Sequence, residues 1–516
     1  MSIKHKTAAV LGLGAVMAFG IGGVALAAPS NPGPGNIDPE IKASLTIHKY
    51  KGDPVDPAMA NDGSLLNPGP TNDPLKGVSF KACPVTGLNI HDPADWPTIT
   101  KLNTAIQDSA IHAFPTTGFD GVSVGTDCLT GTTNDDGEIL WSAVTQGVYY
   151  VTETGAPTNV AEHTLPFLVT VPMAHPSNNT WIYDVHVYPK NAVMTIDKAA
   201  NDAEHVGVGS TVSWDVTMQV PDTQRNFEDY RLRDVLDSRL TYVADSMKLV
   251  LGGTEMLATD YTLTTTDNTL LVVLTSAGLT KLDAAKPASL VWTFDTVVTS
   301  IGNGVIENDA SVMTNNPTGN WTDDGLPSEK VSSNWGAVEI LKYGDKDNTK
   351  FLSNAVFQVF GSEADANACV TAVTAAKGSL PAGCDNAVKV TRDAAGNEVT
   401  PAQDKFTTGT DGKVVIPGLH VGIDDSTTRG YWLVEIVPPA GFINANAVYP
   451  ITVTAGAIGS DAMVTQDVPN AQEPPTTMPQ TGAVVSGILI AASIALGGGA
   501  VFLLAGKNRK NASEVA

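Results

Sequence analysis

The chain has 516 residues, and its 54 acidic against 30 basic side chains give a formal net charge of −24. That charge excludes the basic surface on which nucleic-acid binding depends, so nucleic acid is not an expected partner. Apolar residues make up 42% of the chain, too many for a disordered acidic protein, and the length predicts three or four domains at roughly 100–200 residues each.

The first 27 residues are predicted to be a secretory signal peptide. Lys4 and Lys6 precede an apolar run over residues 8–24, which ends at the small-residue cleavage pattern Ala25-Leu26-Ala27. A spacer rich in Pro, Gly and Asn follows, which argues against a membrane anchor at this end. We therefore expect an exported protein.

Most of the remaining chain alternates short β-branched runs with Gly, Asn, Asp and Pro, a pattern typical of all-β sandwiches. Three similar strands, each ending in a lysine, begin at Ala43, Ala192 and Ala337 and predict three domain starts. The expected division is 28–191, 192–335 and 336–471, followed by a sorting region over 472–516. Helical periodicity favours two short helical insertions in loops, at 95–107 and 363–376.

Four cysteines are expected to form disulfides, because an exported chain folds in an oxidising environment. Four cysteines permit three pairings. The gap of more than 200 residues between the two groups favours Cys83–Cys128 and Cys369–Cys384. A zinc site is not predicted, because the C-x-x-C spacing of zinc ligands is absent.

Each predicted domain places one lysine on the apolar face of its first strand. Side chains alternate between the two faces of a strand, so these lysines share a face with apolar residues two positions away. A later strand of each domain carries an acidic residue among apolar neighbours in the same way. The lysines are Lys49, Lys198 and Lys342, and the acids are Glu153, Asp234 and Glu435.

An asparagine lies near the end of each domain, namely Asn191, Asn308 and Asn470. Burial lowers the pKa of a lysine and raises that of a carboxyl group, so a neutral amine would face a carboxamide polarised by a protonated acid. Attack with loss of ammonia would leave a Lys–Asn isopeptide bond. The alternative is a set of buried salt bridges with hydrogen-bonded asparagines.

The C-terminal region combines a short motif, Met478-Pro479-Gln480-Thr481-Gly482, with an apolar stretch over 483–505 and a basic tail. The apolar stretch is long enough to cross a bilayer as a helix. The motif resembles the LPXTG sorting signal of Gram-positive cell-wall proteins, with Met478 in place of Leu. The resemblance implies that a sortase cuts between Thr481 and Gly482 and transfers the Thr481 carboxyl group to an amine.

Two further motifs indicate the family. The segment from Trp181 to Asn191 matches the WxxxVxVYPKN pilin motif of Gram-positive sortase-assembled pili. The segment around Glu435 is similar to the E-box of these proteins, with Ile436 and Phe442 replacing the usual Thr and Tyr. The chain therefore resembles a major, or backbone, pilin such as the subunits of actinobacterial fimbriae.

The resemblance implies three tandem immunoglobulin-like sandwiches of the collagen-adhesin B and A types. A class C sortase would join Thr481 of one subunit to Lys190 of the next, and we expect Lys190 to point away from the core because it is out of strand phase with Val185 and Val187. The implied internal bonds are Lys342–Asn470 with Glu435, Lys198–Asn308 with Asp234 (Asn315 being the alternative to Asn308), and Lys49–Asn191 with Glu153.

The expected partners are other copies of the chain, a class C pilin sortase, a housekeeping sortase, peptidoglycan, tip or minor pilins, and a host or bacterial surface ligand. The sequence contains none of the common catalytic motifs, so we expect no enzyme, cofactor or metal. A wall-anchored adhesin or a minor or tip pilin is the alternative function. The expected location is a surface pilus attached covalently to the Gram-positive cell wall.

Overall fold

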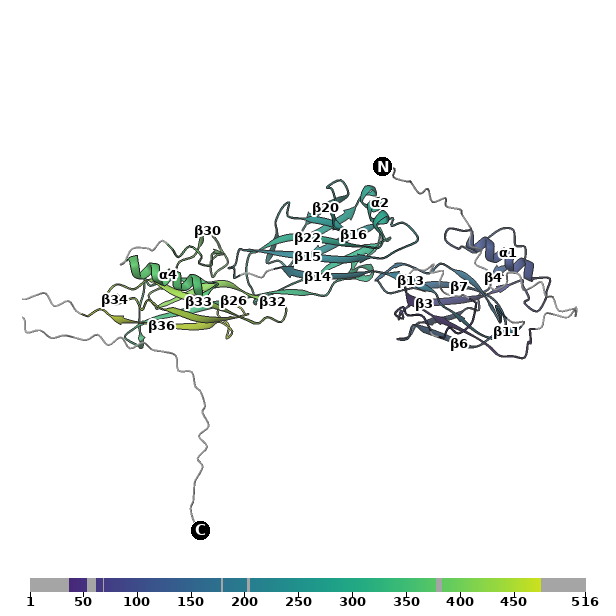
Figure 1. The fold of residues 1–516 in the computed structure, drawn as a ribbon, viewed down its shortest axis with the longest axis horizontal. Helices are drawn as coiled ribbons and strands as arrows, with labels where there is room; N and C mark the ends of the chain where they lie inside the picture. The colour runs from purple at the N-terminus through teal and green to yellow at the C-terminus, as the bar shows by residue number, and fades with distance from the viewer. Residues whose placement is uncertain are drawn as a thin grey trace, which may run out of the picture. The chain divides into compact units, whose positions relative to one another are not determined.

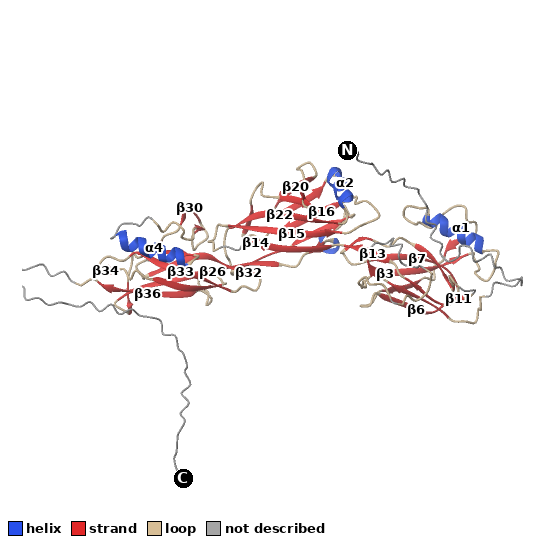
Figure 2. Ribbon diagram, viewed as in Figure 1, coloured by secondary structure: helices blue, strands red, loops and turns tan. Residues whose placement is uncertain are grey.

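The computed structural model describes residues 37–52, 62–67, 69–177, 180–201, 205–376 and 383–474. The predicted signal peptide, sorting motif with Thr481 and Gly482, membrane span and basic tail lie outside the described residues. The fold is mostly β-sheet with short helices, as predicted (Figure 2). In the part of the chain that is described, no helix combines the length and the apolar composition that a membrane crossing needs.

The N-terminal part builds its sheets around its first strand, which is parallel to β12 and antiparallel to β6. One apolar cluster contains side chains from these strands and from β3 and β7 of a second sheet. The ribbon labels β3, β6 and β7 in this part of the chain (Figure 1). The strands of these sheets are β1 (Ala43–His48), β12 (Asp184–Val187), β6 (Glu138–Val144), β4 (Ser123–Val124), β3 (Ser79–Thr86), β7 (Gly147–Gly155), β9 (Phe167–Val171) and β5 (Leu129–Thr132).

A third sheet continues the parallel pairing of β1 and β12 along the chain. Its central strand lies between a parallel and an antiparallel neighbour, in the order β2 (Tyr50–Lys51), β13 (Lys190–Val193) and β8 (Val160–Glu162). A small hairpin joins β10 (Met173–Ala174) and β11 (Trp181–Ile182). Lys190 and Asn191, which the sequence places at the end of a strand, thus lie on a strand that pairs with a neighbour on each side.

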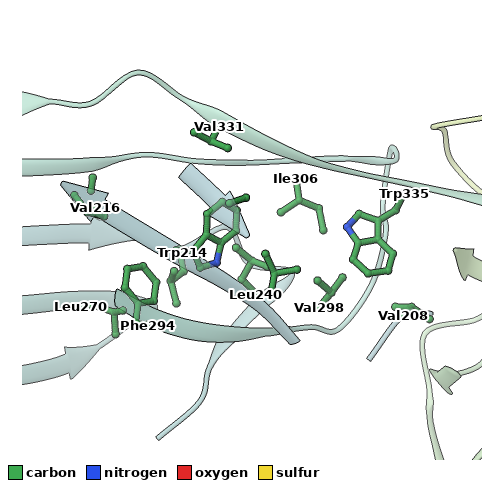
Figure 3. Packing of buried hydrophobic residues seen from close by; sticks show 14 of the residues in the cluster. Val208, Trp214, Val216, Leu240, Leu270, Phe294, Val298, Ile306, Val331 and Trp335 are labelled. Atoms are coloured by element: carbon green, nitrogen blue, oxygen red, sulfur yellow. The ribbon is translucent and has the colours of Figure 1, made fainter. Parts of the chain in front are cut away.

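Two sheets form the middle part. The first contains β14 (Thr195–Asn201), β15 (Thr211–Val220), β22 (Ala288–Val298), β18 (Lys248–Leu251), β19 (Thr254–Glu255) and β17 (Leu240–Tyr242). The second contains β20 (Tyr261–Thr266), β21 (Thr269–Leu274), β16 (Tyr230–Val235), β24 (Ala310–Thr314) and β25 (Leu326–Pro327). The core between them includes Trp214, Phe294 and Leu270 (Figure 3).

The C-terminal part again has two main sheets. One contains β23 (Val305–Asn308), β26 (Val331–Gly344), β36 (Val464–Gln472), β34 (Phe442–Ile443), β27 (Asp347–Phe351) and β32 (Lys413–Ile423). The other contains β31 (Phe406–Thr407), β28 (Val356–Phe360), β33 (Thr428–Val437) and β35 (Val448–Thr454), and a separate hairpin pairs β29 (Val390–Arg392) with β30 (Glu398–Gln403).

The strands pass through two of the predicted domain boundaries without a break. Strand β26 runs from 331 to 344, across the predicted boundary at 335, and β13 runs from 190 to 193, across the one at 191. Residues on β26 therefore pair both with β23 and with β36. The division into three domains stays a prediction, but its linkers are strands and not loops.

The two predicted helices are present as α1 (Trp96–Gln107) and α4 (Glu363–Ala376). The sequence reasoning missed α2 (Ser276–Ala285) and α3 (Trp321–Asp324). Their signals were the capping residues: Thr275 accepts a hydrogen bond from the Gly278 amide, and Asn320 accepts one from the Thr322 amide. Both helices are short, so their periodicity is weak.

The two predicted disulfides are present. Cys83 on β3 is bonded to Cys128, and Cys369 on α4 is bonded to Cys384. The first bond fastens the loop that holds Cys128 to a strand, and the second fastens helix α4 to the loop that holds Cys384. None of the described cysteines is free.

Candidate functional site

The C-terminal site brings Lys342, Glu435 and Asn470 together. Strands β26 and β36 are parallel, with Gly344 opposite Asn470, so Lys342 lies two residues away on the same face of the sheet. Glu435 reaches the pair from β33 of the opposing sheet. Its Oε1 is 3.1 Å from Lys342 Nζ, and its two oxygens accept hydrogen bonds of 3.0 and 2.8 Å from Asn470 Nδ2.

Burial controls the charges at this site. The side chains of Lys342 and Glu435 are 0% and 1% exposed. Desolvation lowers the pKa of Lys342 to about 8, although the charge of Glu435 opposes the change. Desolvation likewise raises the pKa of Glu435, against the attraction of Lys342 and the hydrogen bond from Asn470. Both shifts favour a neutral amine next to a protonated carboxyl group.

The middle site places Lys198, Asp234 and Asn308 in the core between sheets. Lys198 lies on β14 with its Nζ hydrogen-bonded to Asp234 on β16, and Asn308 Nδ2 at the end of β23 is 3.5 Å from Asp234 Oδ2. The rings of Trp214 and Phe294 lie 5.0 and 5.2 Å from Lys198 Nζ. Desolvation lowers the pKa of Lys198 and raises that of Asp234.

The alternative asparagine of the middle part, Asn315, lies outside this cluster. It is exposed, and its side chain accepts a hydrogen bond from the backbone amide of Glu228. Its φ of 51° marks it as a turn residue after β24. The structure therefore brings Asn308, and not Asn315, to Asp234.

The N-terminal site repeats the strand arrangement of the C-terminal one. Parallel strands β2 and β13 place Lys51 opposite Asn191, so Lys49 again lies two residues before the paired position. Lys49 Nζ is 2.6 Å from Asn191 Oδ1 and 3.2 Å from Glu153 Oε2, and Asn191 Nδ2 donates to Glu153 Oε1 at 2.8 Å. Burial lowers the pKa of Lys49 to about 8.

Two residues of this site were missed by the sequence reasoning, His163 and Thr164. His163 Nδ1 is 2.6 Å from Glu153 Oε1, and the Thr164 amide donates to Asn191 Oδ1 at 2.7 Å. Burial alone would raise the pKa of Glu153, but the hydrogen bond with His163, the charge of Lys49 and the hydrogen bond from Asn191 together lower it. Both residues belong to the loop after β8, which carries no strand periodicity.

The expectation that Lys190 points away from the core is wrong. Lys190 is 3% exposed, and residues 190, 191 and 192 are all buried. The phase argument assumed a strand with one face in solvent, whereas three consecutive residues of β13 are buried, so both faces of this strand are covered. The hydroxyl of Thr164 also donates to the Lys190 carbonyl at 2.6 Å, which ties the strand to the neighbouring loop.

The described residues contain no group of three or more His, Cys, Asp or Glu side chains arranged to hold a metal ion. The three sites share an amine, a carboxyl group and a carboxamide. In each set the acid contacts both the lysine and the asparagine, so a proton can pass between lysine and acid.

Comparison with known proteins places the chain in a family. A family model described as the Gram-positive pilin subunit D1, N-terminal domain, matches residues 40–192. The fimbrial subunit type 2 of Actinomyces naeslundii is 30% identical over 562 aligned residues, which cover all of this chain and 99% of the relative. The chain belongs to the Gram-positive pilins. It is thus a structural subunit of a cell-surface pilus, which polymerises with other pilin subunits.

Other pilins match this chain over most of its length, and two solved ones share its fold. The fimbrial subunit type 1 of Actinomyces viscosus is 29% identical and covers 97% of both chains. The solved full-length major pilin SpaD of Corynebacterium diphtheriae has a TM-score of 0.58 at 24% identity, covering 85% of this chain and 99% of that one. The fimbrial protein FimP of Actinomyces oris has a TM-score of 0.54 at 23% identity, covering 86% and 100%.

Proposed function

We propose that this pilin is the shaft subunit of a covalent pilus and that it cross-links itself at three sites. The observation that carries the proposal is the threefold recurrence of one buried acid that contacts both a buried lysine and a buried asparagine. A buried ion pair is a poor source of stability by itself, because desolvation offsets the attraction. The recurrence, in two sites at equivalent positions of parallel strands, therefore favours a chemical role.

The reaction at the C-terminal site follows from the contacts. Lys342 in its neutral form attacks Asn470 Cγ, while the protonated carboxyl of Glu435 polarises the carboxamide. The Nζ–Cγ bond forms and the Cγ–Nδ2 bond breaks. One Nζ proton passes through Glu435 to Nδ2, so that the leaving group departs as ammonia. The same roles fall to Lys198, Asp234 and Asn308. At the N-terminal site Lys49 and Asn191 are the reacting groups, and Glu153 is the carboxylate that contacts both. The major pilin SpaA of C. diphtheriae, a structural neighbour, is described as carrying stabilising isopeptide bonds.

Polymerisation uses different atoms. We propose that a class C sortase cuts between Thr481 and Gly482 and joins the Thr481 carboxyl to Lys190 Nζ of the next subunit, and that a housekeeping sortase transfers the finished polymer to peptidoglycan. Because Lys190 is buried, strand β13 or a segment covering it must move when the sortase engages. The precursor is then held at the membrane by residues 483–505 until it is cut.

The intact mass of the chain spanning 28–481 tests the internal bonds. Each Lys–Asn bond removes one ammonia, about 17 Da, and we expect three such losses beyond the four hydrogens of the two disulfides. Lys342→Ala should restore one ammonia. A full, unmodified mass for a folded chain would reduce the three sites to buried salt bridges.

A sortase assay tests the polymer bond separately. Wild-type chain incubated with a class C pilin sortase should form a ladder of covalent multimers, and Lys190→Ala should not. Lys51→Ala is a matched control, because Lys51 lies on the neighbouring strand and its side chain forms an exposed ion pair with Asp73. A ladder that survives Lys190→Ala would exclude Lys190 as the linking residue.

A further inference from the structure

The N-terminal site differs from the other two by a fourth side chain. The imidazole of His163 lies 2.6 Å from Glu153 Oε1, the same oxygen that accepts the hydrogen bond from Asn191. The Glu153 side chain is 2% exposed and that of His163 is 53% exposed. The ring thus connects a buried carboxylate with solvent.

The charge state of the acid differs accordingly among the three sites. The pKa values of Asp234 and Glu435 are raised by desolvation, and no histidine of the described chain contributes to either shift. At Glu153 the same desolvation is outweighed, first by the hydrogen bond with His163 and then by the charge of Lys49. The middle and C-terminal acids are therefore poised to hold a proton, whereas Glu153 is held as a carboxylate.

If Glu153 stays a carboxylate, another group must accept the proton that Lys49 loses before it can attack. Glu153 Oε2 is 3.2 Å from Lys49 Nζ, and Glu153 Oε1 is in contact with His163 Nδ1, so the acid bridges the amine and the ring. A neutral imidazole can accept that proton. An imidazolium cannot, because both of its ring nitrogens already carry a proton and neither can accept the one that Lys49 must lose before it attacks.

We propose that His163 is the proton acceptor for self-cross-linking at the N-terminal site, so that this bond forms when the ring is neutral and is blocked when the ring is protonated. The inference rests on the isopeptide chemistry proposed above and adds a residue to it. His163 contacts the acid and not the reacting atoms, so it is a positioning and proton-accepting residue and its effect is specific to one of the three sites.

The atoms balance in two proton transfers. One proton of the Lys49 ammonium passes through Glu153 to His163, which frees the amine to attack Asn191 Cγ. The oxyanion forms at Asn191 Oδ1, where the Thr164 amide donates at 2.7 Å. A second Nζ proton passes through Glu153 to Asn191 Nδ2, the Cγ–Nδ2 bond breaks and ammonia leaves. The proton on His163 then passes to solvent.

Other charged groups face His163 from the elements around it. Besides Glu153 and Lys49, the ring lines a cavity of about 530 Å³ together with charged side chains of neighbouring loops and strands: Glu162, Arg225, Glu228, Asp323 and Asp324. Glu162 is neutralised by Arg225, whose Nε is 2.9 Å from Glu162 Oε1. The cavity keeps the ring in contact with water, which is the final proton acceptor.

The experiment follows bond formation against pH in the chain spanning 28–481. Unfolded chain from inclusion bodies is diluted out of denaturant into buffers between pH 5.5 and 8.0, and samples are quenched, digested and analysed by mass spectrometry. The Lys49–Asn191 peptide is measured relative to the Lys342–Asn470 peptide of the same molecules, which corrects for folding. We expect the relative rate in wild type to rise about tenfold with pH, because only a neutral imidazole can accept the lysine proton.

His163→Gln should abolish this rise and leave the N-terminal rate at pH 8.0 below that of wild type. His175→Gln, another histidine of the same part of the chain, should keep the wild-type profile. A pH-independent wild-type rate, or a rise that persists in His163→Gln, would overturn the role of His163 and leave the proposed bonds standing. If only the Lys342–Asn470 peptide forms at every pH, both this inference and the proposed N-terminal bond are wrong, while the C-terminal bond stands.

Discussion

Replacing Glu435 by alanine removes the acid on which the C-terminal cross-link depends. The change leaves Lys342, which is 0% exposed, without its counter-ion and without a group to take its proton. We expect the peptide that contains Asn470 to keep its ammonia. The chain then loses a cross-link that closes a loop of roughly 130 residues, which by the loop-closure treatment used for disulfides is worth about 5 kcal/mol.

The uncompensated lysine adds to that loss, because breaking a buried pair costs about 3–5 kcal/mol unless the remaining group changes its protonation. Because Lys342 can lose its proton and become neutral, the loss of the cross-link alone gives the lower estimate of the decrease in the free energy of unfolding. A loss of about 5 kcal/mol lowers the unfolding temperature of a unit of this size by about 10–20 °C. Calorimetry measures the shift, and peptide mass spectrometry measures the bond.

Two further variants serve as controls for Glu435→Ala. Glu435→Gln keeps the volume of the side chain, so a loss of the bond in this variant cannot be assigned to a cavity. Lys413→Ala removes an ion pair on the strand next to Lys342, with Nζ 2.8 Å from Glu339 Oε1, and should change stability by about 1 kcal/mol or less because the pair is partly exposed. A complete Lys342–Asn470 bond in Glu435→Ala would refute the role given to Glu435.

Three other outcomes are expected. The rate of C-terminal bond formation should be nearly constant from pH 6 to 8 and should fall above about pH 8. The reaction needs one proton that Lys342 and Glu435 share, and that proton is lost as the pH rises through the lowered lysine pKa of about 8. Timed mass spectrometry at several pH values measures this rate. Asn308→Ala should restore one ammonia to the intact mass and Asn315→Ala should restore none, whereas the reverse result would move the middle bond to Asn315. Replacing Cys369 and Cys384 by serine should cost about 3 kcal/mol, the value for a 15-residue loop, and leave every ammonia loss unchanged; urea unfolding measures it, and an unchanged midpoint would contradict it.

Strand periodicity was sufficient to predict which lysines and acids lie in the core. Lys198 is buried together with Met194 and Ile196, and Lys342 with Val338 and Ile340, as two-residue alternation requires. This prediction worked because these strands bury one face strongly and their neighbours on the other face are more exposed. The same argument failed for Lys190, because consecutive residues of β13 are buried and both faces of this strand are therefore covered.

What the sequence by itself determined is the type of protein: the motifs around Lys190 and Glu435, the β-rich pattern and the paired cysteines are local features that need no knowledge of the fold. What only the tertiary structure decided is which groups meet. Three findings depend on how one sheet packs against another and on the position of a loop, which the spacing of residues in the sequence does not indicate. They are the choice of Asn308 over Asn315, the burial of Lys190 and the contact of His163 with Glu153. Because proton transfer acts over a few ångströms, the chemistry of each site follows from those contacts.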